Sequence, residues 1–227
     1  MLTILIPAYN EEQRIKATLS DYLDYFKEEN IEILVILNGC TDKTLEIVKS
    51  FNSPKINYLN IPEAIGKGGA IVEGFKIAHG DLISYVDADN STKPFFLDHL
   101  VKNLGTYDGV MGSRYLEGSN LLTKQPILRR IASRGFNVLT RILLNLKYLD
   151  TQAGAKVFKK EAIHSILPEL DILGWGFDVN ILYKLKQKGY KVQEVPIDWE
   201  EQGGSKLKMR NAIPGMFKTL LKIRFKR

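Results

Sequence analysis

From Leu2 to Val86 the chain alternates between short apolar runs and longer stretches in which apolar residues recur every three or four positions. The short runs predict buried strands, because they are rich in β-branched residues and end at turn-forming residues. These strands are Leu2–Pro7, Ile31–Leu37, Ile56–Asn60 and Leu82–Val86. The periodic stretches predict the helices Glu11–Glu28, Lys43–Phe51 and Lys67–Ala78. Such alternation is typical of a parallel sheet with right-handed crossovers.

After Asp89 the alternation is less regular, yet strand-like and helix-like segments still follow one another. The strand-like pieces are Asp108–Met111, Lys156–Phe158, Val192–Val195 and Asp198–Trp199. Helical spacing predicts helices at Ile131–Leu149, Ala162–Leu167, Val179–Lys188 and Asn211–Lys226. The sequence has no internal repeat, linker or break in composition. We therefore predict one α/β domain over residues 1–210, followed by a C-terminal helical appendage over residues 211–227.

The composition is that of a globular protein, with 44% hydrophobic and 26% charged residues in 227. A single cysteine, Cys40, excludes an internal disulfide and most zinc sites, and it favours a reducing compartment. No apolar run approaches the ~20 residues that cross a bilayer. The N-terminus begins at once with a strand-like segment, so we expect no signal peptide and a cytoplasmic location.

The formal net charge of +6 is concentrated in two zones. From Gly203 to Arg227 there are eight basic residues and no acidic one, and Ser119 to Leu149 is also free of acidic residues. Such zones indicate an anionic partner, which would be a nucleic acid, a phosphorylated substrate or a membrane surface. A solvated helix face explains each zone equally well.

Polar segments follow three of the predicted parallel strands, at the edge of the sheet where ligands bind in such folds. The sharpest is Asp87-Ala88-Asp89, in which two carboxylates could converge on one divalent cation. Hard oxygen ligands suit Mg²⁺ or Mn²⁺, and a diphosphate would complete the coordination shell. The alternative is a turn that uses aspartate to cap a helix.

Gly66-Lys67-Gly68-Gly69 opens a predicted helix and lacks the spacing of a P-loop. The first strand is also not followed by the glycine pattern of a dinucleotide-binding fold. A glycine-rich helix start still accommodates an anion, so we interpret Lys67 as a donor to a diphosphate or a sugar. Plain helix initiation is the alternative.

Together, these motifs resemble those of family 2 glycosyltransferases, in their order along the chain. The motifs of the first half are Pro7-Ala8-Tyr9-Asn10-Glu11, Asn38–Asp42, Gly66-Lys67-Gly68, Asp87-Ala88-Asp89 and Gly112–Tyr115. Those of the second half resemble the dolichyl-phosphate β-glucosyltransferase branch, with polyprenyl-phosphate mannosyltransferases as close relatives. They are Asp150–Gly154, Trp175–Asp178, Glu194–Trp199 and Gly203–Leu207. The resemblance implies a GT-A fold, a Rossmann-like and mostly parallel sheet flanked by helices, with a nucleotide-sugar half (1–115) and an acceptor half (116–210).

The resemblance also assigns residues to three parts of a site. The residues implied to line the nucleoside and base are Pro7, Tyr9, Glu11, Asn38 and Asp42. Asp89 is implied to hold the metal, and Asp87, the second candidate metal ligand, is implied to face the base or ribose side. Arg114 is implied to help bind phosphate, beside the contact of Lys67 with a diphosphate or sugar. Those implied to lie near the acceptor, the reacting sugar or the diphosphate are Asp150, Gln152, Ser205 and Lys206. Asn38-Gly39-Cys40 departs from the Asp-Asp-Gly-Ser that is more usual in the family at this turn. Asn90-Ser91-Thr92 follows where the mannosyl relatives often have a Gln ligand, and this second difference favours the glucosyl branch.

The implied activity is inverting transfer of glucose from UDP-glucose to a polyprenyl (dolichyl) phosphate, with Mg²⁺ or Mn²⁺. A lipid phosphate is already anionic and needs positioning more than a general base. We accordingly interpret His79, His99 and His164, on predicted helices, as packing or surface residues. Asp150 would orient the acceptor or sugar, or simply begin a loop; Asp178 would support the acceptor site or cap a helix.

Two basic amphipathic stretches bear on membrane contact, since relatives often carry transmembrane helices and this sequence shows none. Their apolar stripes are Phe136, Leu139, Leu143 and Leu146, and Ile213, Met216, Phe217, Leu220 and Leu221. Such helices can lie among lipid headgroups, although amphipathic helices more often pack on a sheet. We expect a peripheral protein on the cytoplasmic face of a membrane.

The alternative functions keep or abandon the fold. GDP-mannose as donor, or a soluble glycan as acceptor, keeps it. A catalytically inactive sugar-nucleotide sensor also keeps it, although the intact acidic and basic motifs argue against this. A nucleic-acid-binding module would use the basic zones, but it leaves Asp87 and Asp89 unexplained, so we expect no nucleic-acid partner.

Overall fold

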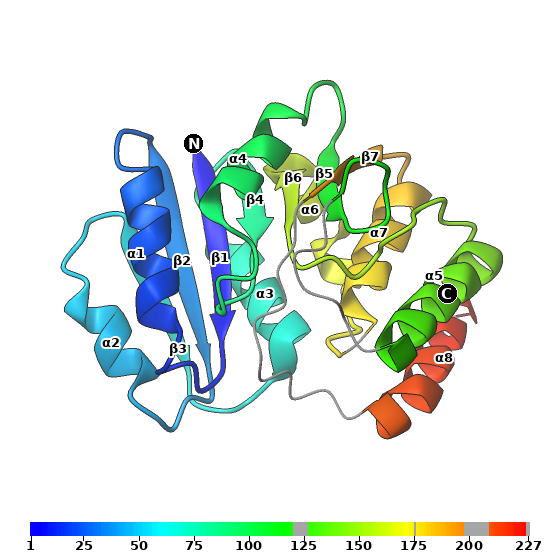
Figure 1. Ribbon diagram of the computed structural model, residues 1–227, viewed down its shortest axis with the longest axis horizontal. Helices are drawn as coiled ribbons and strands as arrows, with labels where there is room; N and C mark the ends of the chain where they lie inside the picture. The colour runs from blue at the N-terminus through cyan, green and yellow to red at the C-terminus, as the bar shows by residue number, and fades with distance from the viewer. Residues whose placement is uncertain (120–126, 175, 198–208, 226–227) are drawn as a thin grey trace.

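The computed structural model describes residues 1–119, 127–174, 176–197 and 209–225, and in this part of the chain a seven-stranded sheet is covered by helices on both faces (Figure 1). The strand order is β3-β2-β1-β4-β6-β5-β7. The strands are β1 (Leu2–Ala8), β2 (Ile31–Asn38), β3 (Ile56–Ile61), β4 (Leu82–Tyr85), β5 (Gly109–Ser113), β6 (Lys156–Lys159) and β7 (Val192–Pro196). The helices are α1 (Ile15–Tyr25), α2 (Thr44–Ser50), α3 (Gly66–Ile77), α4 (Pro94–Lys102), α5 (Ile127–Leu144), α6 (Lys160–Ile166), α7 (Phe177–Gln187) and α8 (Met209–Phe225), with a 3₁₀ turn at Leu167–Glu169.

The first four strands are parallel, as their alternation with helices predicts. Strand β1 lies between β2 and β4, with Leu2 opposite both Ile31 and Leu82. Successive residues of β1 enter opposite cores: Leu5 packs on one face, and Ile4 and Ile6 pack on the other. Because both faces are covered, these strands are continuously apolar rather than alternating.

Strand β6 runs antiparallel between β4 and β5, which makes the sheet mixed rather than wholly parallel. Its first residue, Lys156, lies opposite Tyr85 near the end of β4 and opposite Met111 near the end of β5. The start of an antiparallel strand meets the ends of its parallel neighbours. The segment just before β6 therefore lies at the sheet edge where the polar segments after β1, β2 and β4 lie.

The helices form two layers. One core contains buried residues of α1, α2 and α4; the other contains those of α3, α6, α7, α5 and α8. Helices α5 and α8 pack side by side beyond α7 (Figure 1). The sequence reading gave no range for helix α4, which begins with a proline and buries Leu97 and Leu100. Proline in the first turn is a recognised helix start.

The predicted helix Ile131–Leu149 is shifted, because α5 runs from Ile127 to Leu144. It ends where Asn145 adopts a left-handed conformation, with φ of 52°. The Nζ of Lys186, on α7, donates hydrogen bonds to the backbone oxygens of Leu144 (3.3 Å) and Asn145 (2.5 Å). A cation on the last carbonyls stabilises a helix C-terminus, so a tertiary contact sets this boundary.

Other boundaries differ less. Helix α1 begins at Ile15 rather than at Glu11, after a turn in which the amide of Arg14 bonds to the oxygen of Glu11. The strand-like piece Asp198–Trp199 lies outside the described residues. Across the described part of the chain, every helix is too short or too polar to pass through a bilayer.

Candidate functional site

The loops that follow β1 and β2 are joined by hydrogen bonds at the carboxyl end of the sheet. The Glu12 amide donates to Asp42 Oδ2 (3.1 Å), and the Thr41 amide donates to Asn10 Oδ1 (2.8 Å). Asp42 Oδ1 also accepts the Thr44 amide at the start of α2 (3.0 Å). Burial alone would raise the pKa of Asp42, but these hydrogen bonds outweigh it and hold the pKa below its ordinary value. Asp42 thus organises both loops.

The other residues assigned to the nucleoside lie on the loop after β1 or on the last residues of β1 and β2. Asn38 is buried, and its Oδ1 accepts the amide of Ile65 (2.8 Å). Glu11 forms a bidentate ion pair with Arg14, with Nε–Oε2 of 2.7 Å and Nη2–Oε1 of 2.8 Å. Tyr9 is exposed, and Pro7 is half-buried near the end of β1. Tyr9 is 47% exposed, so its ring lies at the surface of this part of the site.

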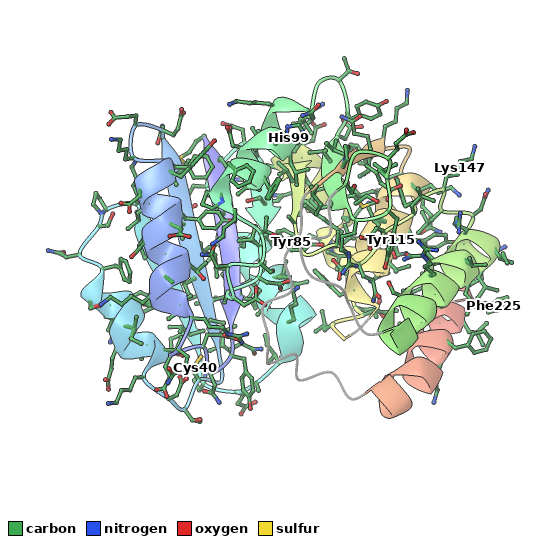
Figure 2. All side chains as sticks on the ribbon, viewed as in Figure 1. Cys40, Tyr85, His99, Tyr115, Lys147 and Phe225 are labelled. Carbon is green, nitrogen blue, oxygen red and sulfur yellow. The ribbon has the colours of Figure 1, made fainter. Side chains whose placement is uncertain are left out.

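Cys40 marks this edge in Figure 2, where it lies below the ends of β1 and β2. Its thiol donates to the backbone oxygen of Ala8 (3.3 Å). The preceding Gly39 has a φ of +69°, and a Cβ there would lie 2.7 Å from the Ala64 nitrogen. Only glycine allows the β2 loop to approach the segment before α3 so closely.

Asp87 and Asp89 follow β4 directly, and each faces a basic side chain. Lys67 Nζ lies 2.5 Å from Asp87 Oδ1, and Arg14 Nη1 lies 4.0 Å from Asp89 Oδ2. Asp89 Oδ1 accepts the amide of Ser91 (3.0 Å). The side chains of Asp87 and Asp89 remain 33% and 25% exposed, so both lie partly at the surface.

These carboxylates fit a hard divalent cation in donor chemistry. Oxygen ligands are those that Mg²⁺ and Mn²⁺ prefer. The described residues contain no group of three or more His, Cys, Asp and Glu side chains arranged to hold a metal. A cation on Asp87 and Asp89 would therefore need further oxygens from a bound diphosphate or from water, as Mg²⁺ commonly does.

Arg114, at the end of β5, is held by the fully buried Asp150. Its Nε and Nη2 donate to the two carboxylate oxygens at 2.7 and 2.8 Å, and its amide donates to Oδ2 at 3.1 Å. Glu194, on β7, accepts the amides of Leu149 and Asp150, each at 2.8 Å. Burial raises the pKa of Glu194, although these amides oppose the shift. The antiparallel β6 makes this arrangement possible, because it brings residue 150 to the end of β5.

A second arginine reaches the same region from α5. The ring of Tyr115, labelled in Figure 2, has the guanidinium carbon of Arg114 at 5.7 Å and that of Arg134 at 5.5 Å from its centre. Tyr115 also shares a hydrogen bond with Ser133 (3.1 Å). In the sequence, Arg134 stands within the acid-free zone from Ser119 to Leu149. Its spacing carries no signal of this stacking, which requires α5 to lie beside the end of β5.

Lys156 is the least expected residue of the site, since it is a fully buried lysine at the start of β6. Its Nζ donates to Asp178 Oδ1 (2.7 Å) and to the backbone oxygen of Ala153 (2.6 Å). Tyr85, central in Figure 2, donates to the same Asp178 oxygen (2.6 Å). Burial would raise the pKa of Asp178, but the ammonium groups of Lys156 and Lys67 outweigh it and keep this pKa below its ordinary value. The only sequence signal was a lysine opening an apolar strand.

The remaining assigned residues are placed as follows. Gln152 is half-buried in the segment before β6. Ser205 and Lys206 lie outside the described residues. His79 follows α3 instead of lying on it and contacts Glu32 at the opposite edge of the sheet (Nδ1–Oε1 2.8 Å). His99 and His164 lie on α4 and α6.

The chain is similar in sequence and in fold to known proteins. Residues 3–167 match the family model described as Glycosyl transferase family 2. A dolichyl-phosphate beta-glucosyltransferase of Trichomonas vaginalis is 37% identical, over 93% of this chain and 67% of that protein. Glycosyltransferase AglD of Haloferax volcanii is 30% identical over 97% of this chain, which spans only 36% of AglD. The crystal structure of Mycobacterium tuberculosis glucosyl-3-phosphoglycerate synthase with Mn²⁺, UDP and phosphoglyceric acid has a TM-score of 0.74 at 19% identity, covering 99% of this chain and 78% of that one.

The structural likeness confirms the predicted α/β, GT-A-like fold, with a mixed and mostly parallel sheet between helices. The family match covers most of the sheet, including both aspartates after β4 and the Arg114–Asp150 pair. The chain belongs to glycosyl transferase family 2, and among its members it is similar to the dolichyl-phosphate beta-glucosyltransferases.

Proposed function

We propose that this glycosyltransferase transfers glucose from UDP-glucose to a polyprenyl (dolichyl) phosphate, with inversion and with Mg²⁺ or Mn²⁺. One observation carries the proposal. At a single edge of the sheet lie the partly exposed Asp87 and Asp89, and also Arg114 and Arg134, the second of which belongs to the helix pair α5 and α8. The similarity to dolichyl-phosphate beta-glucosyltransferases over nearly the whole chain supports the same substrates.

On the donor side, the nucleoside would lie against Pro7, Tyr9 and Glu11, with Asn38 and Asp42 shaping the loop near the base. Asp87 and Asp89 would hold the cation, which when bound stabilises the charge on the leaving diphosphate. Lys67 would add a positive charge beside the same phosphates. The bond from the sugar C1 to the UDP oxygen breaks, and UDP leaves as the anion.

On the acceptor side, an oxygen of the lipid phosphate attacks C1 from the opposite face. This oxygen carries negative charge at neutral pH, so it needs orientation and exclusion of water rather than removal of a proton. Arg114 and Arg134 would bind the phosphate. Asp150 is buried and bonded to Arg114, so we assign it a positioning role. Gln152 would face the reacting sugar, and Ser205 and Lys206 would close over the phosphates.

The lipid acceptor requires contact with a membrane surface, and the exposed sides of helices α5 and α8 are suited to that contact. Their exposed apolar side chains include Ile142 (71% exposed) and Phe225 (74% exposed), and Phe225 points away from the body of the protein in Figure 2. Neither helix contains an acidic residue. Of the predicted C-terminal stripe, Leu220 is fully buried, so the inner side of α8 packs on the core. We propose that the outer side lies among anionic headgroups on the cytoplasmic face.

This arrangement changes the expected role of residues 211–227. Helix α8 begins at Met209 and packs against α5, so the proposed membrane-contacting part is the outer face of a helix pair. We retain residues 1–115 as the nucleotide-sugar half and 116–210 as the acceptor half. The antiparallel β6 belongs to the second half and lies next to β4 of the first, which joins the two halves in one sheet.

Incubation with UDP-[¹⁴C]glucose, dolichyl phosphate and Mg²⁺ or Mn²⁺ tests the proposal directly. Label should enter the organic phase, and chelation of the metal should prevent it. Parallel reactions with GDP-[¹⁴C]mannose and with a soluble glycan distinguish the alternative donor and acceptor. Absence of transfer from every nucleotide sugar to a lipid phosphate would refute the proposal.

A further inference from the structure

The ammonium group of Lys67 forms an ion pair with Asp87, one of the two carboxylates proposed to bind the divalent cation. Its Nζ lies 2.5 Å from Asp87 Oδ1. The other oxygen of Asp87 faces Gly154, where a Cβ would lie only 2.5 Å from Oδ2. The backbone of residue 154 therefore crowds one side of the carboxylate, and Lys67 covers the other.

The position of Lys67 is set by the way α3 begins. Gly66 has a φ of +81°, and the Gly68 amide donates to the oxygen of Leu173 (3.1 Å). A Cβ at residue 68 would lie 2.6 Å from that oxygen and 2.7 Å from Phe177. The first turn of α3 is thus packed closely against the segment that precedes α7, and this packing directs Lys67 toward Asp87.

A second carboxylate acts on the same lysine from α7. Burial would lower the pKa of Lys67, but the charges of Asp87 and Asp178 outweigh it and raise this pKa. Asp178 is itself bound to the buried Lys156. From β4 to β6, negative and positive side chains therefore alternate in space, in the order Asp87, Lys67, Asp178, Lys156. The side chain of Lys67 is 46% exposed, so it can move without opening the core.

We propose that Lys67 is a resident counter-ion of Asp87, which must leave Asp87 before a divalent cation can bind there. Two cations on one carboxylate repel each other strongly. A nucleoside diphosphate offers Lys67 a new anionic partner, so it lowers the cost of this exchange. Cation and nucleoside diphosphate therefore bind with positive coupling, and by linkage each raises the affinity for the other by the same factor. The inference rests on the metal–diphosphate site of the proposed function.

Electron paramagnetic resonance of free Mn²⁺ measures this coupling without any turnover. Mn²⁺ is titrated into wild type, Lys67→Met and the control Lys76→Met, each with and without UDP. Lys76 lies on the same helix, is half-exposed and pairs with Glu73 at 2.6 Å. In wild type, UDP should tighten Mn²⁺ binding by about 5- to 150-fold, the usual range of coupling between sites.

Removing the competing charge should change one arm of the titration selectively. Lys67→Met should bind Mn²⁺ alone severalfold more tightly than wild type, and UDP should then add much less. Lys76→Met should behave as wild type. Lys67→Gln, also neutral but polar, should repeat the result of Lys67→Met and replaces it if that variant does not fold.

Each outcome decides the inference. Equal affinity of wild type and the Lys67 variants for Mn²⁺ alone, or full UDP coupling in those variants, would overturn it while leaving the proposed transferase intact. If no variant binds Mn²⁺ with or without UDP, both this inference and the metal site of the proposed function are wrong. A change of equal size in Lys76→Met would show a general charge effect and would also overturn it.

Discussion

Replacement of Asp150 by alanine should be the most damaging single change in the acceptor half. Asp150 is fully buried, and its two carboxylate oxygens accept three hydrogen bonds from Arg114. The substitution removes a buried carboxylate with which the largely buried Arg114 guanidinium forms an ion pair. Removal of one partner of a buried ion pair typically costs about 3–5 kcal/mol.

That cost has a measurable size for a chain of this length. In proteins of 150–250 residues, 1 kcal/mol shifts the thermal unfolding midpoint by roughly 2–4 °C, so Asp150→Ala should lower it by about 6–20 °C. Differential scanning calorimetry or circular dichroism gives the midpoint. Asp150→Asn keeps an acceptor for one hydrogen bond and should fall between alanine and wild type. Asp81→Ala is the matched control, since Asp81 is exposed and pairs with the N-terminal ammonium group at 3.0 Å.

The same variants distinguish the role of Asp150 in orienting Arg114 from its role in the stability of the fold. If Asp150 acts by orienting Arg114, Asp150→Asn should raise the KM for the lipid phosphate at a temperature where the protein is fully folded. The affinity for UDP, from calorimetric titration, should be unchanged. A midpoint for Asp150→Ala within about 2 °C of wild type, less than 1 kcal/mol, would refute the buried-pair reasoning. A midpoint for Asp81→Ala that falls as far would show that the effect is not specific to burial.

Three further changes test other parts of the molecule. Asp89→Ala should reduce ¹⁴C transfer by more than about a hundredfold without lowering the unfolding midpoint, because a lost metal ligand forfeits several kcal/mol of charge stabilisation; wild-type turnover would contradict the metal assignment. The double variant Ile142→Asp/Phe225→Asp should weaken sedimentation with anionic liposomes by about tenfold or more, since each apolar side chain contributes roughly 1.5–3 kcal/mol when buried. The control Phe95→Asp changes an exposed residue on α4 and should leave sedimentation unchanged. Burial would raise the pKa of Glu32, but hydrogen bonds from neighbouring groups outweigh it and hold this pKa below its ordinary value of 4.5. The ionised carboxylate therefore stabilises the fold above that pH, and this stabilisation is lost as the pH falls through the lower folded pKa. Glu32→Gln should make the unfolding midpoint depend less on pH below 4.5, and a pH dependence equal to that of wild type in a series of thermal melts would refute this.

The structure also explains why point substitutions test membrane contact better than truncation does. Leu220 and Ile223 on α8 are buried in the core that contains Phe136 and Phe177. Deletion of residues 211–227 would therefore expose apolar core as well as remove the outer basic face. Substitution of exposed residues leaves this packing in place, so a loss of liposome binding can be assigned to the surface itself.

Several features of the fold follow from local sequence alone. The apolar runs of β1 and β2 are long enough and β-branched enough to define buried parallel strands, because both faces of the sheet demand apolar residues. The positions of Asp87 and Asp89 after β4 follow directly from where that run ends. Because the carboxyl ends of parallel strands meet at one edge of the sheet, this position also puts them at the same edge as the loops after β1 and β2.

Other features depend on contacts between distant segments and leave little local trace. The direction of β6 is decided by its neighbours, and this direction brings Asp150 within hydrogen-bond distance of Arg114, 36 positions earlier in the chain. The end of α5 depends on Lys186 from α7. The burial of Lys156 is tolerated only because Asp178 supplies its counter-charge. Apolar periodicity identified most strands and helices, because burial acts on every residue of an element, whereas charge pairing depends on single side chains that only the tertiary structure brings together.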